Sequence, residues 1–302
     1  MIKEVCDAAC LHIESIEAGL VLSVISCLIA WSVGFFRLPL KNLSEKPFIS
    51  LKELLIGFGA FLGIALFIAP IISMLWLSYQ SGSSISTIDL SKLDSVTHGW
   101  MNVMNLMLSA LCLFTLVANF SIRARQSIWR EKAFESVKHQ LWDFTFGGLT
   151  WFIVYPLIIV VSQLISYIIL LRWEYSSHLN QVAVKFLTMT TPYPYLLVIT
   201  ILLIVFVVPM MEELLFRGLL QTWLKRCFGT YSAIMISASV FSVFHYSSSQ
   251  GIENIELIAS LFVLGCFLGF IYERQQSLWA SIGLHSIFNG LSVLAILFVE
   301  NN

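Results

Sequence analysis

The chain of 302 residues is divided into long apolar segments, and this division limits its fold more than any other feature. A helix needs about 20 mostly apolar residues to cross the hydrocarbon core of a bilayer. We count eight such segments, of which the sixth and seventh are short: residues 18–36, 54–77, 100–120, 147–171, 195–220, 231–247, 256–272 and 278–298. The sequence therefore predicts an all-α, polytopic membrane protein with about eight transmembrane helices, because spanning segments must pair their own backbone groups.

The composition agrees with a membrane protein and limits its surroundings. Hydrophobic residues make up 58% of the chain and charged residues only 12%, whereas soluble domains carry about 25% charged residues. The formal net charge is −1, and no basic or aromatic-rich patch suggests nucleic-acid binding. We therefore expect membrane lipid around the chain and no nucleic acid as a partner.

Lys and Arg residues are distributed unevenly between alternate connections. Twelve of them lie in the connections on one side of the predicted membrane and four on the other side. Cytoplasmic loops carry the excess of Lys and Arg, so the first side is predicted to face the cytoplasm and both chain ends to lie outside. The short loops are typical of bacterial proteins, and we expect a multi-pass protein of a bacterial plasma membrane.

Two adjacent carboxylates, Glu212 and Glu213, lie inside the fifth apolar segment together with Arg217. A charged side chain at the bilayer centre costs at least ~2.5–3.5 kcal/mol, so such a cluster indicates a functional site. Glu213 and Arg217 are four residues apart and share a helix face, where they should form an ion pair that also holds the helix end. Glu212 points about 140° away from Arg217 and stays free to act as a general base. Pro209 predicts a kink just before the pair.

Two further polar pairs lie in later apolar segments. Phe241 and His245 are four residues apart in the sixth segment, and His285 and Asn289 are four apart in the eighth. The other four of the six histidines fall in the N-terminal segment or in loops. A single His in a span is often a hydrogen-bonded core residue, but two of them after a Glu pair favour a catalytic site on the last four helices. An imidazole and a carboxamide on one face can donate hydrogen bonds to an oxyanion.

Glycines recur at a spacing of four residues in two of the spans, at Gly59 and Gly63 and at Gly265 and Gly269. Small residues at this spacing let helix backbones approach closely. We interpret both pairs as packing positions.

The motifs Glu-Glu-x3-Arg, Phe-x3-His and His-x3-Asn, in this order on successive apolar segments, resemble those of the CAAX-protease and bacteriocin-processing family, also called CPBP or Abi. The resemblance is carried by Glu-Glu-Leu-Leu-Phe-Arg-Gly-Leu-Leu at 212–220 and by Ser-Leu-Trp-Ala-Ser-Ile-Gly-Leu-His-Ser-Ile-Phe-Asn-Gly at 277–290. It covers roughly residues 190–298. We therefore divide the chain into a region at 1–190 without a recognised motif and a catalytic helical core at 191–302.

The resemblance implies an intramembrane endopeptidase that hydrolyses a peptide bond of a membrane-associated peptide or protein. Glu212 and His245 would activate the water. His285 and Asn289 would bind the oxyanion. Three residues would support them: Glu213, Arg217 and Phe241. The cavity is expected to open to the cytoplasm, and no cofactor is expected.

Other interpretations of the same residues remain open. In a zinc-dependent version of the protease, Glu212, His245 and His285 would be the ligands, with water as the fourth. A His-Glu-x2-His motif, which is typical of many zinc peptidases, is absent. A second alternative is that the chain is a membrane scaffold or bacteriocin-immunity partner without enzymatic activity. A transporter is a further alternative, although no half in residues 1–190 mirrors the C-terminal region.

Overall fold

A computed structural model describes residues 2–38, 48–82, 84–85, 89, 93–129, 136–173 and 182–300. These residues form helices joined by turns and loops, and no β-strand occurs among them. Five of the cations counted for the orientation lie outside the described residues: Lys41, Lys46, Lys92, Arg130 and Lys132.

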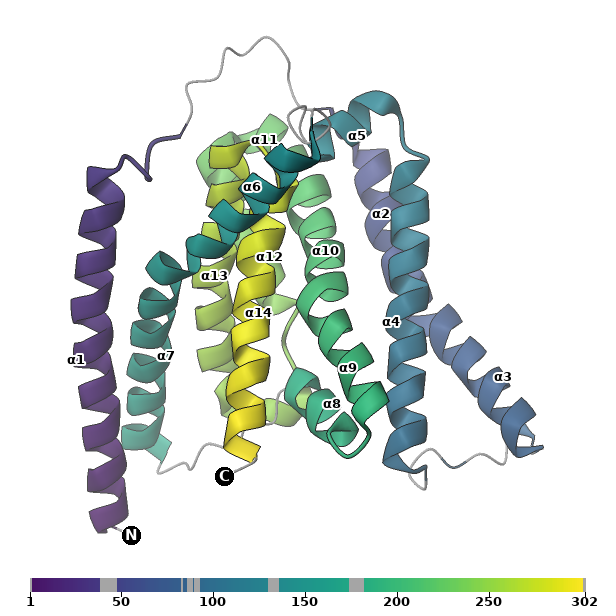
Figure 1. Ribbon diagram of the computed structural model, residues 1–302, viewed down its shortest axis with the longest axis horizontal. Coiled ribbons are helices and arrows are strands. Elements are labelled where there is room, and N and C mark those ends of the chain that lie inside the picture. Colours follow the sequence, from purple (N-terminus) through teal and green to yellow (C-terminus); the bar gives the residue numbers. More distant parts are fainter. Residues whose placement is uncertain are drawn as a thin grey trace.

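The α-helices follow one another along the chain with few long connections (Figure 1). They are α1 (Ile2–Ser32), α2 (Leu51–Gly63), α3 (Ala69–Ser81), α4 (Ser95–Ala118), α5 (Ile122–Trp129), α6 (Val137–Leu149), α7 (Trp151–Trp173), α8 (Val182–Thr190), α9 (Pro194–Leu202), α10 (Val208–Glu213), α11 (Thr222–Phe228), α12 (Thr230–Val243), α13 (Asn254–Gln275) and α14 (Leu278–Glu300). The described residues also include the π-helical segments η1 (Ile64–Ile68), η5 (Leu203–Val207) and η6 (Leu214–Gln221) and the 3₁₀-helical segment η7 (Ser248–Glu253).

Seven helical stretches of the described chain are long and apolar enough to cross a membrane. They are Ala9–Ser32, Leu51–Ser81, Ser95–Ala118, Val137–Arg172, Pro194–Phe228, Ser248–Gln275 and Leu278–Phe298. This finding confirms an all-α, multi-pass membrane protein but not the count of eight. The difference lies at the sixth predicted segment, where α12 has only 14 residues. At about 1.5 Å per residue it is shorter than the ~30 Å hydrocarbon core.

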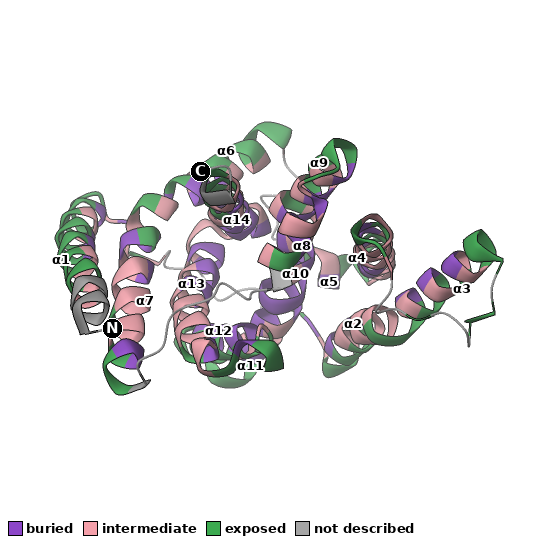
Figure 2. Ribbon diagram, turned by 90° about the horizontal axis from the view of Figure 1, so that it is seen from below, coloured by how far each residue is buried: buried purple, intermediate pink, exposed green. Residues whose placement is uncertain are grey.

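The central helices of the bundle are α10, α12, α13 and α14, and they carry much of the buried surface (Figure 2). The helix α1 lies at one edge against α7, and α3 lies at the opposite edge beside α4 (Figures 1 and 2). Large apolar side chains of α1, such as Leu28 and Trp31, are exposed. Apolar side chains that face outward are expected for helices surrounded by lipid.

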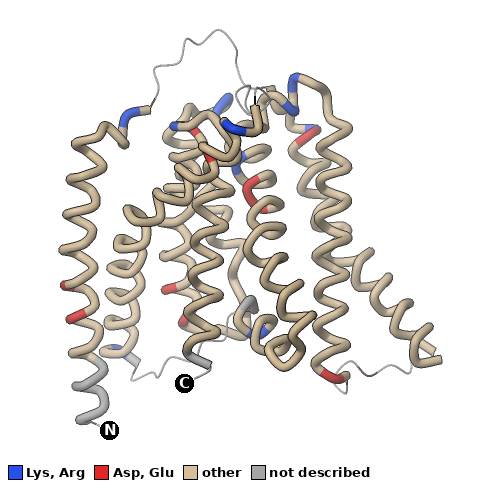
Figure 3. Tube along the Cα trace, in the orientation of Figure 1, with Lys and Arg blue, Asp and Glu red and all other residues tan. Residues whose placement is uncertain are grey.

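Most of the Lys and Arg residues drawn in Figure 3 lie at the end of the bundle where α10 continues into α11. The first helix begins and the last helix ends at the opposite end (Figure 1). This distribution agrees with the charge asymmetry on which the predicted orientation is based. The assignment of the charged end to the cytoplasm stays a prediction.

The position of α14 is fixed by an unusually close contact with α6 from the N-terminal region. A Cβ atom at Gly147 would lie 1.8 Å from the Ala280 carbonyl oxygen, and one at Gly283 would lie 2.0 Å from the Phe144 carbonyl oxygen. Both glycines are therefore required for the approach of the two backbones. Since α14 carries His285 and Asn289, α6 determines where these side chains lie.

Candidate active site

Glu212 and Glu213 end α10, a short α-helix between the π-helical segments η5 and η6. Segments with i→i+5 hydrogen bonds are rare and occur frequently at functional sites. In η5, the N–H of Val208 donates to the Leu203 carbonyl five residues earlier. The helix around the carboxylates is therefore wound differently from the regular α-helix that the sequence predicts.

Glu213 is held by two partners in the protein core. Arg217 Nη1 donates to Glu213 Oε1 at 3.0 Å, and both side chains are fully buried. The ion pair expected from the four-residue spacing is present. His285 Nδ1 lies 2.8 Å from the same oxygen and donates to it, although His285 follows 72 positions later. The contact with His285 depends on the packing of α14 against α10, so helix spacing alone could not reveal it.

Arg217 has two further contacts with neighbouring helices. Its Nη2 donates to the Gly265 carbonyl of α13 at 3.1 Å. Its guanidinium also lies 4.5 Å from the centre of the Phe241 ring. A buried cation needs such compensation, since an unpaired charge in a low dielectric is very costly.

Glu212 lies between the two imidazoles without a hydrogen bond to either. Its Oε2 is 3.8 Å from His245 Nε2 and 3.7 Å from His285 Nε2. The Oε2 atom is buried and makes no hydrogen bond to the protein. Distances of this size are too long for a direct hydrogen bond. The structure thus brings Glu212, His245 and His285 together. The predicted convergence of Asn289 on the same point and the catalytic roles of these residues stay predictions.

Nδ1 of each imidazole is held by a hydrogen bond, so Nε2 faces Glu212 in both cases. His245 Nδ1 lies 2.9 Å from the Phe241 carbonyl oxygen, which can only accept a hydrogen bond, so Nδ1 carries the proton. His285 Nδ1 donates to Glu213 in the same way. With Nδ1–H engaged, Nε2 of a neutral imidazole is free to take a proton.

His245 does not lie on a helix, contrary to the sequence-based prediction of a span over 231–247. The helix α12 ends at Val243, and His245 occupies the turn that follows. The backbone N–H of His245 donates to the Ser242 carbonyl at 3.1 Å, as in a tightened last turn. Its imidazole is 32% exposed, compared with 4% for that of His285. The end of the helix therefore leaves His245 at the open side of the site.

Asn289 reaches a backbone carbonyl that Pro209 leaves without a donor. In the π-helical register the partner of the Ile204 carbonyl would be the N–H of residue 209, and proline has none. Asn289 Nδ2 instead donates to the Ile204 oxygen at 2.9 Å. The amide has a second N–H for another acceptor. Pro209 therefore creates the anchoring point of Asn289, which the sequence-based prediction of a simple kink missed.

Phe241 packs at the centre of these groups and is fully buried. Its ring centre is 4.8 Å from that of His245 and 5.8 Å from that of His285. The contact with His285 is edge to face. Phe241 therefore contacts Arg217 and both imidazoles, and its supporting role stays a prediction.

The sequence reasoning missed an acidic side chain that joins two of the membrane-spanning helices. Glu256 lies near the start of α13 and accepts hydrogen bonds from Ser162 at 2.5 Å and from Ser166 at 2.7 Å, both on α7. Its position at the first residue of the predicted seventh span was the available signal. These hydrogen bonds join α13 to α7 and involve none of the candidate site residues.

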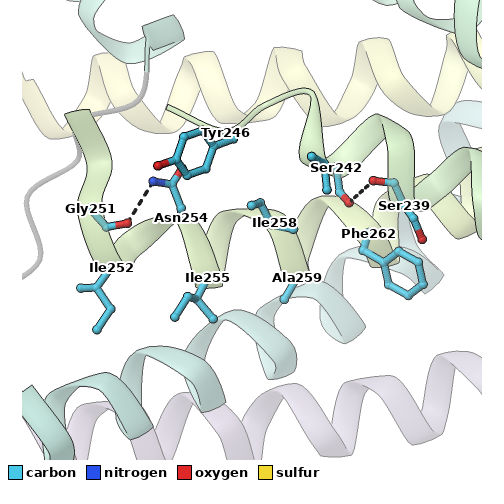
Figure 4. Close-up of a pocket in the computed structure, with 11 residues that line it drawn as sticks. Ser239, Ser242, Tyr246, Gly251, Ile252, Asn254, Ile255, Ile258, Ala259 and Phe262 are labelled. Atoms are coloured by element: carbon cyan, nitrogen blue, oxygen red, sulfur yellow. Dashed lines mark hydrogen bonds between the residues drawn. The ribbon is translucent and has the colours of Figure 1, made fainter. Parts of the chain in front are cut away.

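A hollow of about 620 Å³ lies between the end of α12, η7 and the start of α13 (Figure 4). Its walls are largely apolar, with Ile252, Ile255 and Phe262 among them. Tyr246, which follows His245, also lines it. None of the candidate site residues belongs to its lining.

Comparison with known protein families gives a match within the C-terminal half of the chain. Residues 194–291 match the family described as Rce1-like, type II CAAX prenyl endopeptidase Rce1-like. The match covers 98 of the 302 residues. No curated protein and no solved structure matches the chain.

The match to the Rce1-like family confirms the resemblance drawn from the three motifs and supports a CAAX-type intramembrane protease. The matched residues include every candidate site position from Glu212 to Asn289. Helices α1 to α8 lie outside the match. The division of the chain near residue 190 stays a prediction.

The donor types at the site suit zinc, since two imidazoles and a carboxylate are common zinc ligands. Among the described residues, however, no group of three or more His, Cys, Asp and Glu side chains is arranged to hold a metal ion. Removal of metal ions by chelation would test directly whether these three side chains hold zinc.

Proposed function

We propose that the protein is an intramembrane endopeptidase in which Glu212 and His245 activate water without a metal. The observation that supports this proposal best is the convergence of two Nε2 atoms on Glu212 Oε2, at 3.7 and 3.8 Å, with no direct hydrogen bond between them. A water placed there can donate to the carboxylate and to an imidazole nitrogen at once. Both acceptors are groups that serve as general bases.

The reaction begins when the bound water loses a proton to Glu212 and its oxygen attacks the carbonyl carbon of the substrate. The carbonyl becomes a tetrahedral oxyanion, which needs hydrogen-bond donors. Asn289 supplies its second amide N–H, and His285 supplies Nε2–H when it carries both protons. The proton taken by Glu212 then passes to the leaving amine as the peptide bond breaks.

The fully buried groups have a different task in this proposal. Glu213 orients His285 through Nδ1, and Arg217 holds Glu213 in turn. Such outer contacts fix the ring orientation of a working histidine. Neither Glu213 nor Arg217 is exposed, so the substrate is expected to contact Glu212 and His245 instead.

The substrate class is a peptide or protein associated with the membrane, since the site lies on membrane-spanning helices. A prenylated CAAX tail, which the family description names, is one member of this class. We place the protein in a bacterial plasma membrane with the charged end of the bundle and the opening of the site toward the cytoplasm.

The test uses the full chain in liposomes with a library of membrane-tethered reporter peptides. Wild type should cleave a reporter and should keep this activity after exhaustive chelation. Loss of activity on chelation, with recovery on addition of zinc, would show that Glu212, His245 and His285 act as metal ligands. No cleavage by the wild type, together with a cellular phenotype that survives Glu212→Ala, would favour a scaffold or immunity partner.

A further inference from the structure

Gln221 repeats, one turn later, the contact that Arg217 makes with α13. Arg217 Nη2 donates to the Gly265 carbonyl at 3.1 Å, and Gln221 Nε2 donates to the Gly269 carbonyl at 3.1 Å. Donors and acceptors are both four residues apart, and Gln221 is fully buried. Two side chains of η6 are therefore attached to successive turns of one neighbouring backbone.

The glycines of α13 make these contacts possible. A Cβ atom at Gly269 would lie 2.5 Å from Gln221 Oε1 and 3.2 Å from Ile234 Cγ2. One at Gly265 would lie 3.1 Å from the Cα atom of Ala238 on α12. The pair that the sequence identified as a packing position thus also supplies two backbone acceptors.

The second contact is stabilised further by an ion pair. Gln221 Nε2 also lies 3.3 Å from Glu273 Oε1, and the other oxygen of Glu273 pairs with Lys225. Glu273 is 2% exposed, whereas the side chain of Lys225 is 20% exposed. A chain of contacts therefore runs from Arg217 through Gln221 to the charged end of the bundle.

We propose that Gln221 is a positioning residue for peptide-bond hydrolysis, an inference that rests on the proposed function. On the side of α12, Ser237 donates to the Phe216 carbonyl of η6 at 2.9 Å. On the side of α13, the contacts of Arg217 and Gln221 together limit the rotation of η6. The rotation of η6 determines the direction of the preceding α10 and hence the distance between Glu212 and the two imidazoles. In the proposed mechanism one water contacts these groups, and a small rotation would remove it from one of its partners.

Two variants disturb the same contact from opposite sides. Gln221→Leu removes the amide at similar size, and it leaves Glu273 with Lys225 and Gly269 with its own helix. Gly269→Ala adds a methyl group where the Gln221 amide lies. Each should lower kcat about 10- to 100-fold, as expected for misplacement by up to ~1 Å, with KM changed less than about 2-fold. The kcat of the double variant should be no lower than that of the less active single variant, because neighbouring changes that break one contact are not additive.

Ser162→Ala is the matched control, since it removes a hydrogen bond between α7 and α13 away from the site. It should lower thermal stability to a comparable extent while kcat stays at the wild-type value, and it should add independently to Gln221→Leu. If Gln221→Leu does not fold, Gly269→Ala alone decides. Wild-type kcat in Gly269→Ala or Gln221→Leu, with cleavage by the wild type intact, would overturn the positioning role. Absence of cleavage by the wild type would overturn the proposed function itself.

Discussion

Glu212 and Glu213 are neighbours in the chain, yet the fold gives them opposite surroundings. Glu213 is fully buried and bonded to Arg217 and His285. The side chain of Glu212 is 20% exposed, and its Oε2 makes no hydrogen bond to the protein. The same type of side chain thus serves once as a structural anchor and once as an open acceptor.

The difference comes from the direction in which successive residues leave a helix. Residues next to each other point about 100° apart, so only one carboxylate of a pair can face the core between α13 and α14. That carboxylate must be paired, because a buried charge without a partner is very costly. The other is left at the edge, where water can reach it. We call Glu213 with Arg217 and His285 the rigid half of the site. Glu212 with His245 is the half that the proposed mechanism makes reactive, and we call it the reactive half.

The largest effect is expected in the reactive half. Glu212→Gln should lower the rate of reporter cleavage by ~10²–10⁴, the usual contribution of a general base. The thermal midpoint in detergent should stay near that of wild type, since no protein partner is lost. Cleavage at the wild-type rate by Glu212→Gln would assign the base to another residue.

The rigid half should respond in stability first. Glu213→Gln leaves Arg217 buried without its counter-charge, and breaking one member of a buried pair typically costs ~3–5 kcal/mol. We expect poor expression or an early unfolding transition in detergent, measured beside Glu212→Gln. Equal thermal losses in the two variants would contradict the division between the halves.

Asn289 donates to the Ile204 carbonyl and is also proposed to donate to the oxyanion. These two roles can be tested separately. Asn289→Ala should lower kcat by ~10²–10³, the cost of one oxyanion donor, with little change in KM. Pro209→Ala supplies a backbone N–H that can serve the Ile204 carbonyl. The double variant should therefore regain stability relative to Asn289→Ala without regaining activity. Recovery of both would mean that Asn289 acts only as an anchor.

Phe241 should give the smallest effect. Phe241→Leu keeps an apolar side chain but removes the ring that faces Arg217 and both imidazoles. Aromatic and cation–π contacts are worth about 0.5–2 kcal/mol, so stability should fall by a similar amount and kcat by about tenfold or less. Cleavage and thermal unfolding measured on one preparation test this. A loss as large as that of Glu212→Gln would place Phe241 in the reactive half.

The local features of the site were predictable because they depend on short spacing. The apolar segments predicted the long helices, and the four-residue spacing predicted the contact of Glu213 with Arg217. The limit was the assumption of a regular α-helix throughout. The sixth span ends early at Val243, and π-helical turns flank α10. Neither departure has a periodic signal in the apolar pattern.

The sequence by itself determined that this chain forms apolar membrane helices and that its last helices carry Glu, His and Asn side chains in a family-specific order. The physical reason is that lipid permits few backbone structures and few charges. Only the tertiary structure decided that His285 bonds to Glu213, that Asn289 bonds to the Ile204 carbonyl and that Gln221 is attached to α13. These contacts join residues 48 to 85 positions apart, so they depend on how whole helices pack and not on any local pattern.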